Sequence, residues 1–239
     1  MFRKKTVALL GSLLCLVSFA GAQGLKASLA QMPVYAESKD KGILVDMVKA
    51  ISEASGKPIS FEVVPFARSM DNVITRKVDF HAPLIKNPNI DEKTLKYDHS
   101  TVTIFHVNFT LYTNKSKPVT VENLSKAKVE TDAAHTQYFP FPTIASSDLE
   151  ASLKKVDAGR IDAFIFADLA SDPLVEKLKL KNIKRELYKT FDVKIILPKG
   201  EHGGATDKLL SEAIDKLKAS GKWQQIMGPL DQPFKEKQF

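Results

Sequence analysis

Arg68 is the residue whose type and position point most directly to a chemistry, the binding of an anion. It follows Pro65 and Phe66, at the place where a predicted strand gives way to a predicted helix. A cation in the first turn of a helix is disfavoured by the helix dipole, so an anionic ligand or an acidic neighbour would account for it. A solvated surface arginine explains the same residue equally well.

Enzymatic acid–base chemistry would require a general acid, and His135 and Asp168 are the residues that could supply one. Nothing in the sequence shows that these two side chains meet. Metal-ligand spacing such as H-E-x-x-H does not occur among the five histidines, which are His81, His99, His106, His135 and His202. The sequence also lacks the G-x-S-x-G, P-loop and G-x-G-x-x-G motifs, so we predict neither a metal nor a cofactor.

The elements that position Arg68, His135 and Asp168 are predicted to be strands and helices that alternate along the chain. Gly56 is expected to end the first helix, and Pro83 to end the third strand. We therefore expect an α/β fold whose sheet is mostly parallel and is flanked by helices. The predicted strands cover 25–30, 59–64, 78–82, 102–113, 128–131, 163–167 and 190–200, and the predicted helices include 148–158, 174–178 and 208–220.

One helix-to-strand junction occurs twice. The segments ITRKVDF, from Ile74, and DAGRIDAF, from Asp157, each pass from a helix end through basic residues to an apolar residue and an aspartate. The basic residues suit the end of the helix dipole, and a glycine or lysine is expected to make the turn. The repeat predicts two lobes joined by two β crossings, with lobe one at 23–110 plus 195–239 and lobe two inserted at 111–194.

The first 22 residues have the pattern of a secretory signal peptide. A basic start at 3–5 precedes an apolar stretch at 7–19, which is short for a membrane span, and Ala20, Gly21 and Ala22 form an A-x-A site. We expect cleavage after Ala22 and a periplasmic location; a retained anchor is the alternative. The only cysteine, Cys15, precedes that site, so the mature chain would contain no disulfide.

The charge of the chain argues against nucleic-acid binding. The formal net charge is +7, and cleavage after Ala22 removes three basic residues and lowers it to +4. The basic residues are spread along the chain among Asp and Glu, which is typical of a solvated surface. We therefore predict no nucleic-acid partner.

Five segments in order resemble the bacterial extracellular solute-binding proteins of family 3, the periplasmic amino-acid-type binding proteins. The resemblance covers nearly all of 25–228. It is carried by KGILVDMVKAISEASG (41–56), NVITRKVDF (72–80), LKYDHSTVTIF (95–105), KKVDAGRIDAFI (154–165) and AIDKLKASGKWQQIM (213–227).

The resemblance implies a type II periplasmic-binding-protein-like fold, with two hinged lobes that close on a small solute. Phe66 matches a position where the family places an aromatic ring against the ligand, and Tyr35 matches the first loop of lobe one loosely. Pro83 and Lys86 belong to a segment that lines the family's cleft, and Lys86 is a candidate anion contact. The matching residues of lobe two are His135, Thr136 and Asp168.

The sequence departs from the family where the family grips an α-amino acid. The arginine that clamps the carboxylate is expected at position 91, which holds Asp91. The aspartate that binds the ammonium group is expected at 167, which holds Ala167, and Asp168 comes one residue later. A slip of one residue on a strand turns a side chain to the other face, so an ordinary amino acid is a doubtful ligand.

Three functions follow from the resemblance. The first is a monomeric periplasmic protein that binds a small polar, anionic or zwitterionic solute and presents it to an inner-membrane ABC permease. The second is a ligand sensor for a membrane receptor. The third is an enzyme similar to periplasmic cyclohexadienyl dehydratase, and the first is preferred because a fold alone does not establish catalysis.

Overall fold

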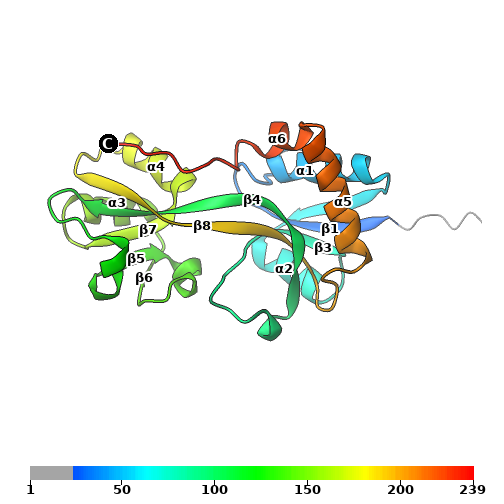
Figure 1. The fold of residues 1–239 in the computed structure, drawn as a ribbon, viewed down its shortest axis with the longest axis horizontal. Coiled ribbons are helices and arrows are strands. Elements are labelled where there is room, and N and C mark those ends of the chain that lie inside the picture. The colour runs from blue at the N-terminus through cyan, green and yellow to red at the C-terminus, as the bar shows by residue number, and fades with distance from the viewer. Residues whose placement is uncertain (1–23) are drawn as a thin grey trace, which may run out of the picture.

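The computed structural model describes residues 24–239, so the predicted signal peptide at 1–22 and its cleavage site lie outside the described residues. Eight strands form one sheet in the order β2-β1-β3-β8-β4-β7-β5-β6 (Figure 1). The strands are β1 (Leu25–Ala30), β2 (Ile59–Val64), β3 (Phe80–Ile85), β4 (Tyr97–Asn114), β5 (Val129–Asp132), β6 (Ile144–Ser146), β7 (Ala163–Ala167) and β8 (Ile183–Pro198).

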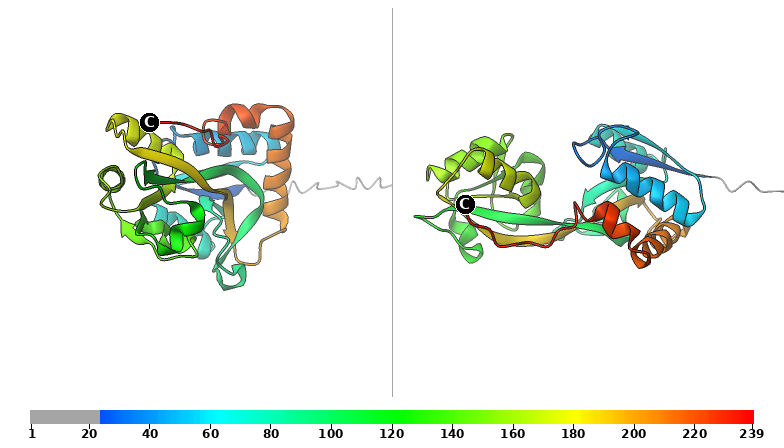
Figure 2. Two further views of the ribbon diagram at one scale, coloured as in Figure 1. Left: turned by 60° about the vertical axis from the view of Figure 1, so that its left-hand side comes forward. Right: turned by 90° about the horizontal axis from the view of Figure 1, so that it is seen from above.

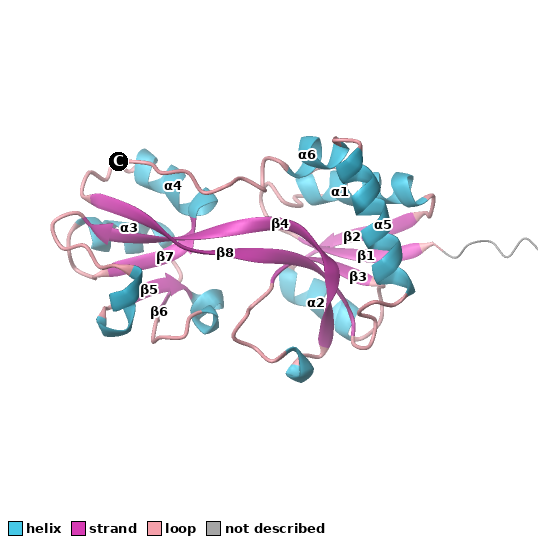
Figure 3. Ribbon diagram, viewed as in Figure 1, coloured by secondary structure: helices cyan, strands magenta, loops and turns pink. Residues whose placement is uncertain are grey.

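Helices cover the sheet at both of its ends (Figure 3). The α-helices are α1 (Ile43–Ser55), α2 (Phe66–Ile74), α3 (Leu149–Asp157), α4 (Asp168–Lys177), α5 (Ala205–Ala219) and α6 (Lys222–Met227). The 3₁₀ helices are η1 (Glu92–Thr94), η2 (Val121–Lys126) and η3 (Ala133–Tyr138). Among the described residues, no helix is both long and apolar enough to span a membrane.

The long antiparallel strands β4 and β8 run through two groups of elements and connect them (Figures 1 and 2). Lobe one holds β1–β3 with α1, α2, α5 and α6, and lobe two holds β5–β7 with α3 and α4. The strands β1, β2 and β3 are parallel, as are β5, β6 and β7. This confirms the predicted α/β fold with two lobes and two β crossings; the predicted residue limits of the lobes stay a prediction.

The repeated junction makes the same backbone contacts in both lobes. The carboxylate of Asp79 accepts a hydrogen bond from the N–H of Lys26 at 2.7 Å, and Asp162 accepts one from the N–H of Lys128 at 2.7 Å. In return, the N–H of each aspartate donates to the carbonyl of the same lysine. Each aspartate thus joins the start of one strand to the start of its parallel neighbour. This explains why the pattern recurs.

In lobe one, the turn before the junction aspartate is made by a residue other than the lysine that we predicted. Gly159 takes a left-handed conformation with φ 65°, as expected, but in lobe one Arg76 does so, with φ 58°, and the neighbouring Lys77 does not. Arg76 is the residue that corresponds to Gly159, three positions before the aspartate. Glycine adopts this region freely, whereas a side chain disfavours it.

The sequence predicted that Pro83 would end the third strand, and this prediction is wrong. Pro83 lies inside β3, where the pairing with β8 shifts register between His81 and Leu84. A proline cannot donate to a ladder, and a bulge is one of the places where a strand tolerates it. The strand therefore continues to Ile85, which brings Lys86 to its end.

The hydrophobic core continues from one lobe to the other. Phe109 on β4 and Phe191 on β8 are both buried, with ring centroids 4.9 Å apart, and they belong to the same cluster as Leu44 of lobe one and Val129 of lobe two. Apolar side chains of the crossing strands therefore pack between the lobes as well as within them.

Candidate functional site

The two lobes contact each other through the loop after β3 and the helix η3. The side-chain amides of Asn87 and Asn89 donate to the carbonyls of Gln137 and Tyr138, both at 2.9 Å. The hydroxyl of Tyr138 donates to the carbonyl of Ile85 at 3.1 Å. These contacts place the loops that follow parallel strands of the two lobes against each other, where ligands bind in open α/β sheets.

Two predicted aromatic residues of lobe one follow the carboxyl ends of β1 and β2, at the same edge of the parallel sheet as the loop after β3. Tyr35, in the loop after β1, is half-buried with its ring 5.9 Å from that of Phe105. Burial raises the pKa of Tyr35, and the charge of Asp168 in lobe two raises it further. Phe66 begins α2 and is 41% exposed, with its ring edge-on to His81 at 5.6 Å.

Arg68 is exposed in the first turn of α2, and its guanidinium forms no ion pair with a described residue. An acidic neighbour therefore does not account for its place at the positive end of the helix. An anionic ligand and a solvated side chain remain as explanations.

Lys86 is already paired in this structure. Its ammonium lies 2.6 Å from the carboxylate of Glu92 in η1, and this hydrogen bond lowers the pKa of Glu92. Asp91, where the family would place its clamping arginine, caps η1 by accepting from the N–H of Lys93 at 3.0 Å. Pro83 is buried within β3. The charged side chains of this segment therefore have their partners within the same loop.

The predicted residues of lobe two lie in an aromatic surrounding. The ring of His135 is 5.2 Å from those of Tyr138 and Phe166 and 5.6 Å from that of Phe109. Its Nδ1 is 2.9 Å from the Asp132 carboxylate. Thr136, the next residue of η3, is half-buried, and its carbonyl accepts from the hydroxyl of Thr143 at 3.4 Å.

Asp168 is turned toward the crossing strands. It is buried at the start of α4 and accepts a hydrogen bond from the side-chain amide of Asn108 at 3.2 Å. The guanidinium of Arg185 lies 3.7 Å from it, and the N–H of Leu169 donates to it at 2.7 Å. Burial raises the pKa of Asp168, and the hydrogen bonds from Asn108 and Leu169 oppose that rise. Among the described residues, Asp168 and His135 share no hydrogen bond.

Sequence reasoning missed Asn108 and Arg185, although β4 carries a signal for the first. Every second residue from 106 to 114 is polar and lies on one face of the strand, in the series His106, Asn108, Thr110, Tyr112 and Asn114. Alternation of this kind marks a face that needs polar partners. The hydroxyl of Tyr112 finds one in Asp172, at 2.7 Å.

Two surface hollows lie away from these residues. One is on α5 beside Ser55, and the other is at the start of β1 beside Arg76. Neither is lined by a predicted site residue. Within 24–239, no group of three His, Cys, Asp or Glu side chains is placed to hold a metal ion. The candidate site is therefore defined by the side chains on the loops between the lobes.

The sequence of residues 24–228 matches the profile of the bacterial extracellular solute-binding proteins, family 3. The chain belongs to this family. The match covers both lobes and both crossing strands, so the resemblance that the five sequence segments indicated is confirmed. No protein of curated function matches the chain.

Solved structures of similar fold include sensors and binding proteins. A histidine kinase sensor domain similar to periplasmic binding proteins has a TM-score of 0.63 at 16% identity, over 87% of this chain and 95% of that one. The GluR0 ligand-binding core from Nostoc punctiforme, in complex with L-glutamate, has a TM-score of 0.61 at 16% identity, over 87% and 100%. The arginine-, lysine- and histidine-binding protein ArtJ from Geobacillus stearothermophilus has 0.56 at 16%, over 87% and 94%. At this identity the similarity establishes the fold.

Proposed function

We propose that this solute-binding protein works in the periplasm as a monomer, closes its two lobes on a small anionic or zwitterionic solute, and presents it to an inner-membrane ABC permease. Family membership supports the solute-binding role. The observation that carries the proposal is the set of hydrogen bonds that join Asn87, Asn89 and Ile85 of lobe one to η3 of lobe two. Lobes that meet through these loops can enclose a solute between them.

The charges around these loops favour an anionic group on the solute. Lys86 is neutralised by Glu92, and Asp168 is engaged by Asn108 and Arg185. Arg68 is an exposed cation in the first turn of α2, two residues after the exposed Phe66. A solute with a carboxylate near Arg68 would gain a charge-assisted hydrogen bond, while Asp168 has less capacity left for an ammonium group.

The enzymatic alternative has less support than binding. A dehydratase needs a general acid in contact with its substrate. His135 is bonded to Asp132, and Asp168 to Asn108, so the two candidate acids share no hydrogen bond that would join them in one acid–base site. We therefore propose that the protein binds its solute without converting it.

The test is thermal unfolding of residues 23–239 against a panel of amino acids, organic acids, sugars, polyamines and aromatic acids. A ligand at 100 times its dissociation constant adds about 2.7 kcal/mol to the free energy of unfolding. That corresponds to a rise of about 5–10 °C in the midpoint for a protein of this size. A shift confined to carboxylates supports the proposal, and no shift by any anion or zwitterion contradicts it.

Arg68→Ala then tests the anion contact. A charge-assisted hydrogen bond contributes roughly 1.5–3 kcal/mol, so affinity for the carboxylate found by the panel should fall by about tenfold or more in calorimetry. Arg160→Ala is the matched control, because Arg160 is also exposed but lies at the far junction of lobe two. Equal affinities for the two variants would remove Arg68 from the site.

A further inference from the structure

Residues 231–239 follow α6 and lie outside the segment that matches the family, which ends at 228. They leave lobe one, run beside β4 and β8, and end against lobe two (Figures 1 and 2). At its start, this segment is anchored in lobe one by Leu230, which is buried in the common core. The chain therefore passes between the lobes a third time.

The first contacts of the segment are with the polar face of β4. The carboxylate of Asp231 accepts from the N–H of His106 at 3.0 Å and lies 2.9 Å from its Nδ1. The carbonyl of Gln232 accepts from the side-chain amide of Asn108 at 2.9 Å. These contacts give partners to His106 and Asn108, two of the five residues on the polar face of β4.

The next contacts are with Arg185, whose side chain is 2% exposed. Its guanidinium lies 4.5 Å from the ring centre of Phe234 and donates to the carbonyl of Lys235 at 2.6 Å. The same guanidinium reaches Asp168 at 3.7 Å and Asp172 at 3.1 Å. A buried guanidinium needs most of its donors satisfied, so the segment and the two carboxylates together hold Arg185 in place.

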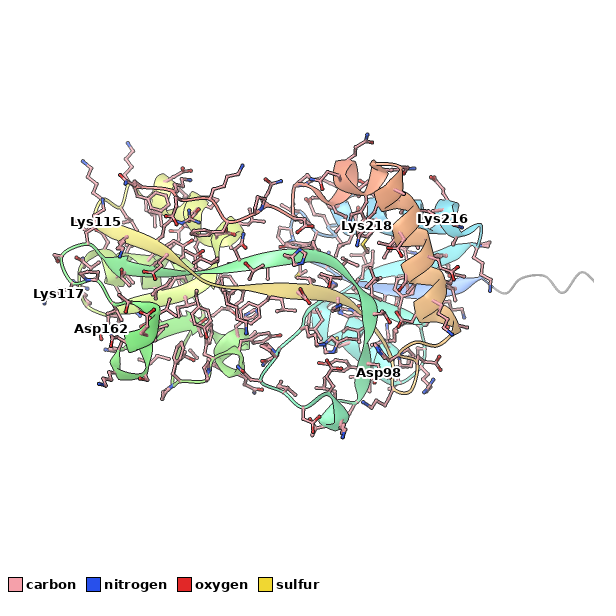
Figure 4. The ribbon with its side chains drawn as sticks, viewed as in Figure 1. Asp98, Lys115, Lys117, Asp162, Lys216 and Lys218 are labelled. Atoms are coloured by element: carbon pink, nitrogen blue, oxygen red, sulfur yellow. The ribbon has the colours of Figure 1, made fainter. Side chains whose placement is uncertain are left out.

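The last contacts are with lobe two. Lys237 forms an ion pair with Glu176 of α4 at 2.5 Å. The ring of Phe239 packs against the apolar cluster of lobe two. Its carbonyl accepts from the ammonium of Lys115, a residue that Figure 4 labels at the far end of that lobe, at 2.6 Å. The segment is thus fixed at both ends and along its length.

We propose that residues 231–239 form a strap that restrains the opening of the two lobes and holds Asp168 in place through Asn108 and Arg185. Two strands form a hinge that can bend and twist, and a third segment anchored on both lobes limits those motions. Asn108 donates to both Gln232 and Asp168, and Arg185 touches both Lys235 and Asp168. Asn108 and Arg185 are therefore positioning residues, and the role of Asp168 toward solute rests on the proposed function.

The test measures the separation of the lobes without any ligand. Lys117 and Lys216 are exposed residues at opposite ends of the molecule, in lobe two and on α5 of lobe one (Figure 4). The predicted mature chain has no cysteine, so K117C and K216C give one specific pair of spin labels. The strap is removed by ending the chain at Leu230, and it is weakened at full length by D231A with F234A.

Both strap variants should show a broader distribution of inter-label distances with a longer mean. Amide exchange at Leu169, whose N–H bonds to Asp168, should quicken by about tenfold as each lost contact lowers the local free energy of opening. D215A is the matched control, since Asp215 is exposed on α5 away from the strap. If the shortened chain does not fold, the full-length double variant decides.

Unchanged distances in the folded double variant would overturn the restraint on opening. Longer distances with unchanged exchange at Leu169 would overturn the role of Asn108 and Arg185 in holding Asp168. Both readouts are taken on ligand-free protein, so they stand even if the panel of solutes finds no ligand. The failure of the strap and the failure of the proposed solute-binding site are therefore separate results.

Discussion

The two lobes have the same helix-to-strand junction, but they differ in the side chains that they bury two residues farther along the strands. In lobe one, Ser28 on β1 is paired with His81 on β3, and in lobe two the corresponding pair is Glu130 on β5 and Phe164 on β7. All four residues are buried. The backbone scheme that Asp79 and Asp162 complete is thus compatible with a titratable ring in one lobe and a titratable carboxylate in the other.

The difference shows which part of the fold is set by backbone contacts and which by side chains. In lobe one, His81 Nε2 is 3.2 Å from the carbonyl of Pro83, and Nδ1 is 2.5 Å from the hydroxyl of Ser69. A carbonyl only accepts, so Nε2 carries the proton and neutral Nδ1 accepts from Ser69. In lobe two, Glu130 is held by the ammonium of Lys155 at 2.9 Å and by the hydroxyl of Ser152 at 2.7 Å.

The largest expected difference between the lobes is a loss of folding stability at acid pH, which arises from His81 in lobe one. Burial lowers the pKa of His81 from 6.5 to about 4. Between those values the unfolded chain binds a proton that the folded chain does not, so stability present above pH 6.5 is lost as the pH falls to 4. The loss is about 3 kcal/mol. Urea unfolding from pH 7.5 to 4.5 should show it in the native chain and less of it in His81→Gln.

His81→Gln keeps a donor and an acceptor but does not titrate, so the comparison concerns the slope with pH and not the stability at one pH. Carboxylates elsewhere contribute equally to both proteins. Parallel curves for the two proteins would show that His81 is protonated in the folded state near its ordinary pKa, and that the lobes do not differ in this way.

The second expected difference is that the stability of lobe two depends on the ammonium group of Lys155. Lys155→Ala would leave the carboxylate of Glu130 buried with Ser152 as its main donor. Removing one partner of a buried ion pair costs several kcal/mol, but Lys155 is itself 42% exposed. We therefore expect a loss of about 2 kcal/mol, measured by urea unfolding at pH 7.

Lys177→Ala is the matched control for this loss. Lys177 pairs with Glu150 at 2.7 Å in the same lobe, and both side chains are more exposed, at 67% and 34%. An exposed pair contributes about 0–1 kcal/mol. Equal losses in the two variants would show that Glu130 is hydrated despite its burial.

The alternation of apolar residues predicted most of the fold because it depends on neighbours in the chain. The strands at 25–30, 59–64 and 163–167 occur as predicted, and Asp148 caps α3, which was predicted at 148–158. The junction aspartates were also found from sequence alone. The three-residue strand β6 was missed, since so short a segment carries too little pattern.

The partners of the site residues could not be predicted in the same way. The pairing of Lys86 with Glu92 and of Asp168 with Arg185 depends on how loops and strands meet in space. Residues 231–239 carry no apolar period, and their place along β4 follows from contacts with His106 and Asn108 that are more than a hundred residues distant in the chain. The only signal that tertiary contacts of this kind leave in the sequence is a row of polar residues on one face of the partner strand.

The smallest effect tests the turn of the junction. Gly159 and Arg76 both have left-handed backbones, but an added Cβ at Gly159 would meet no atom within 4 Å. Gly159→Ala should therefore cost about 1 kcal/mol through backbone strain alone. Urea unfolding at pH 7 measures the loss.

Arg76→Gly is the reverse exchange in lobe one, and it should have the opposite sign and a smaller size. The glycine relieves the strain at φ 58°, but the change also removes a bond from Arg76 to Glu201 at 3.3 Å and one to the carbonyl of Lys199 at 2.5 Å. These contacts are exposed, so the net gain should be about 0.5 kcal/mol or less. A marked loss on Arg76→Gly would mean that those two contacts outweigh the strain. Lobe one would then have a reason to place arginine where lobe two has glycine.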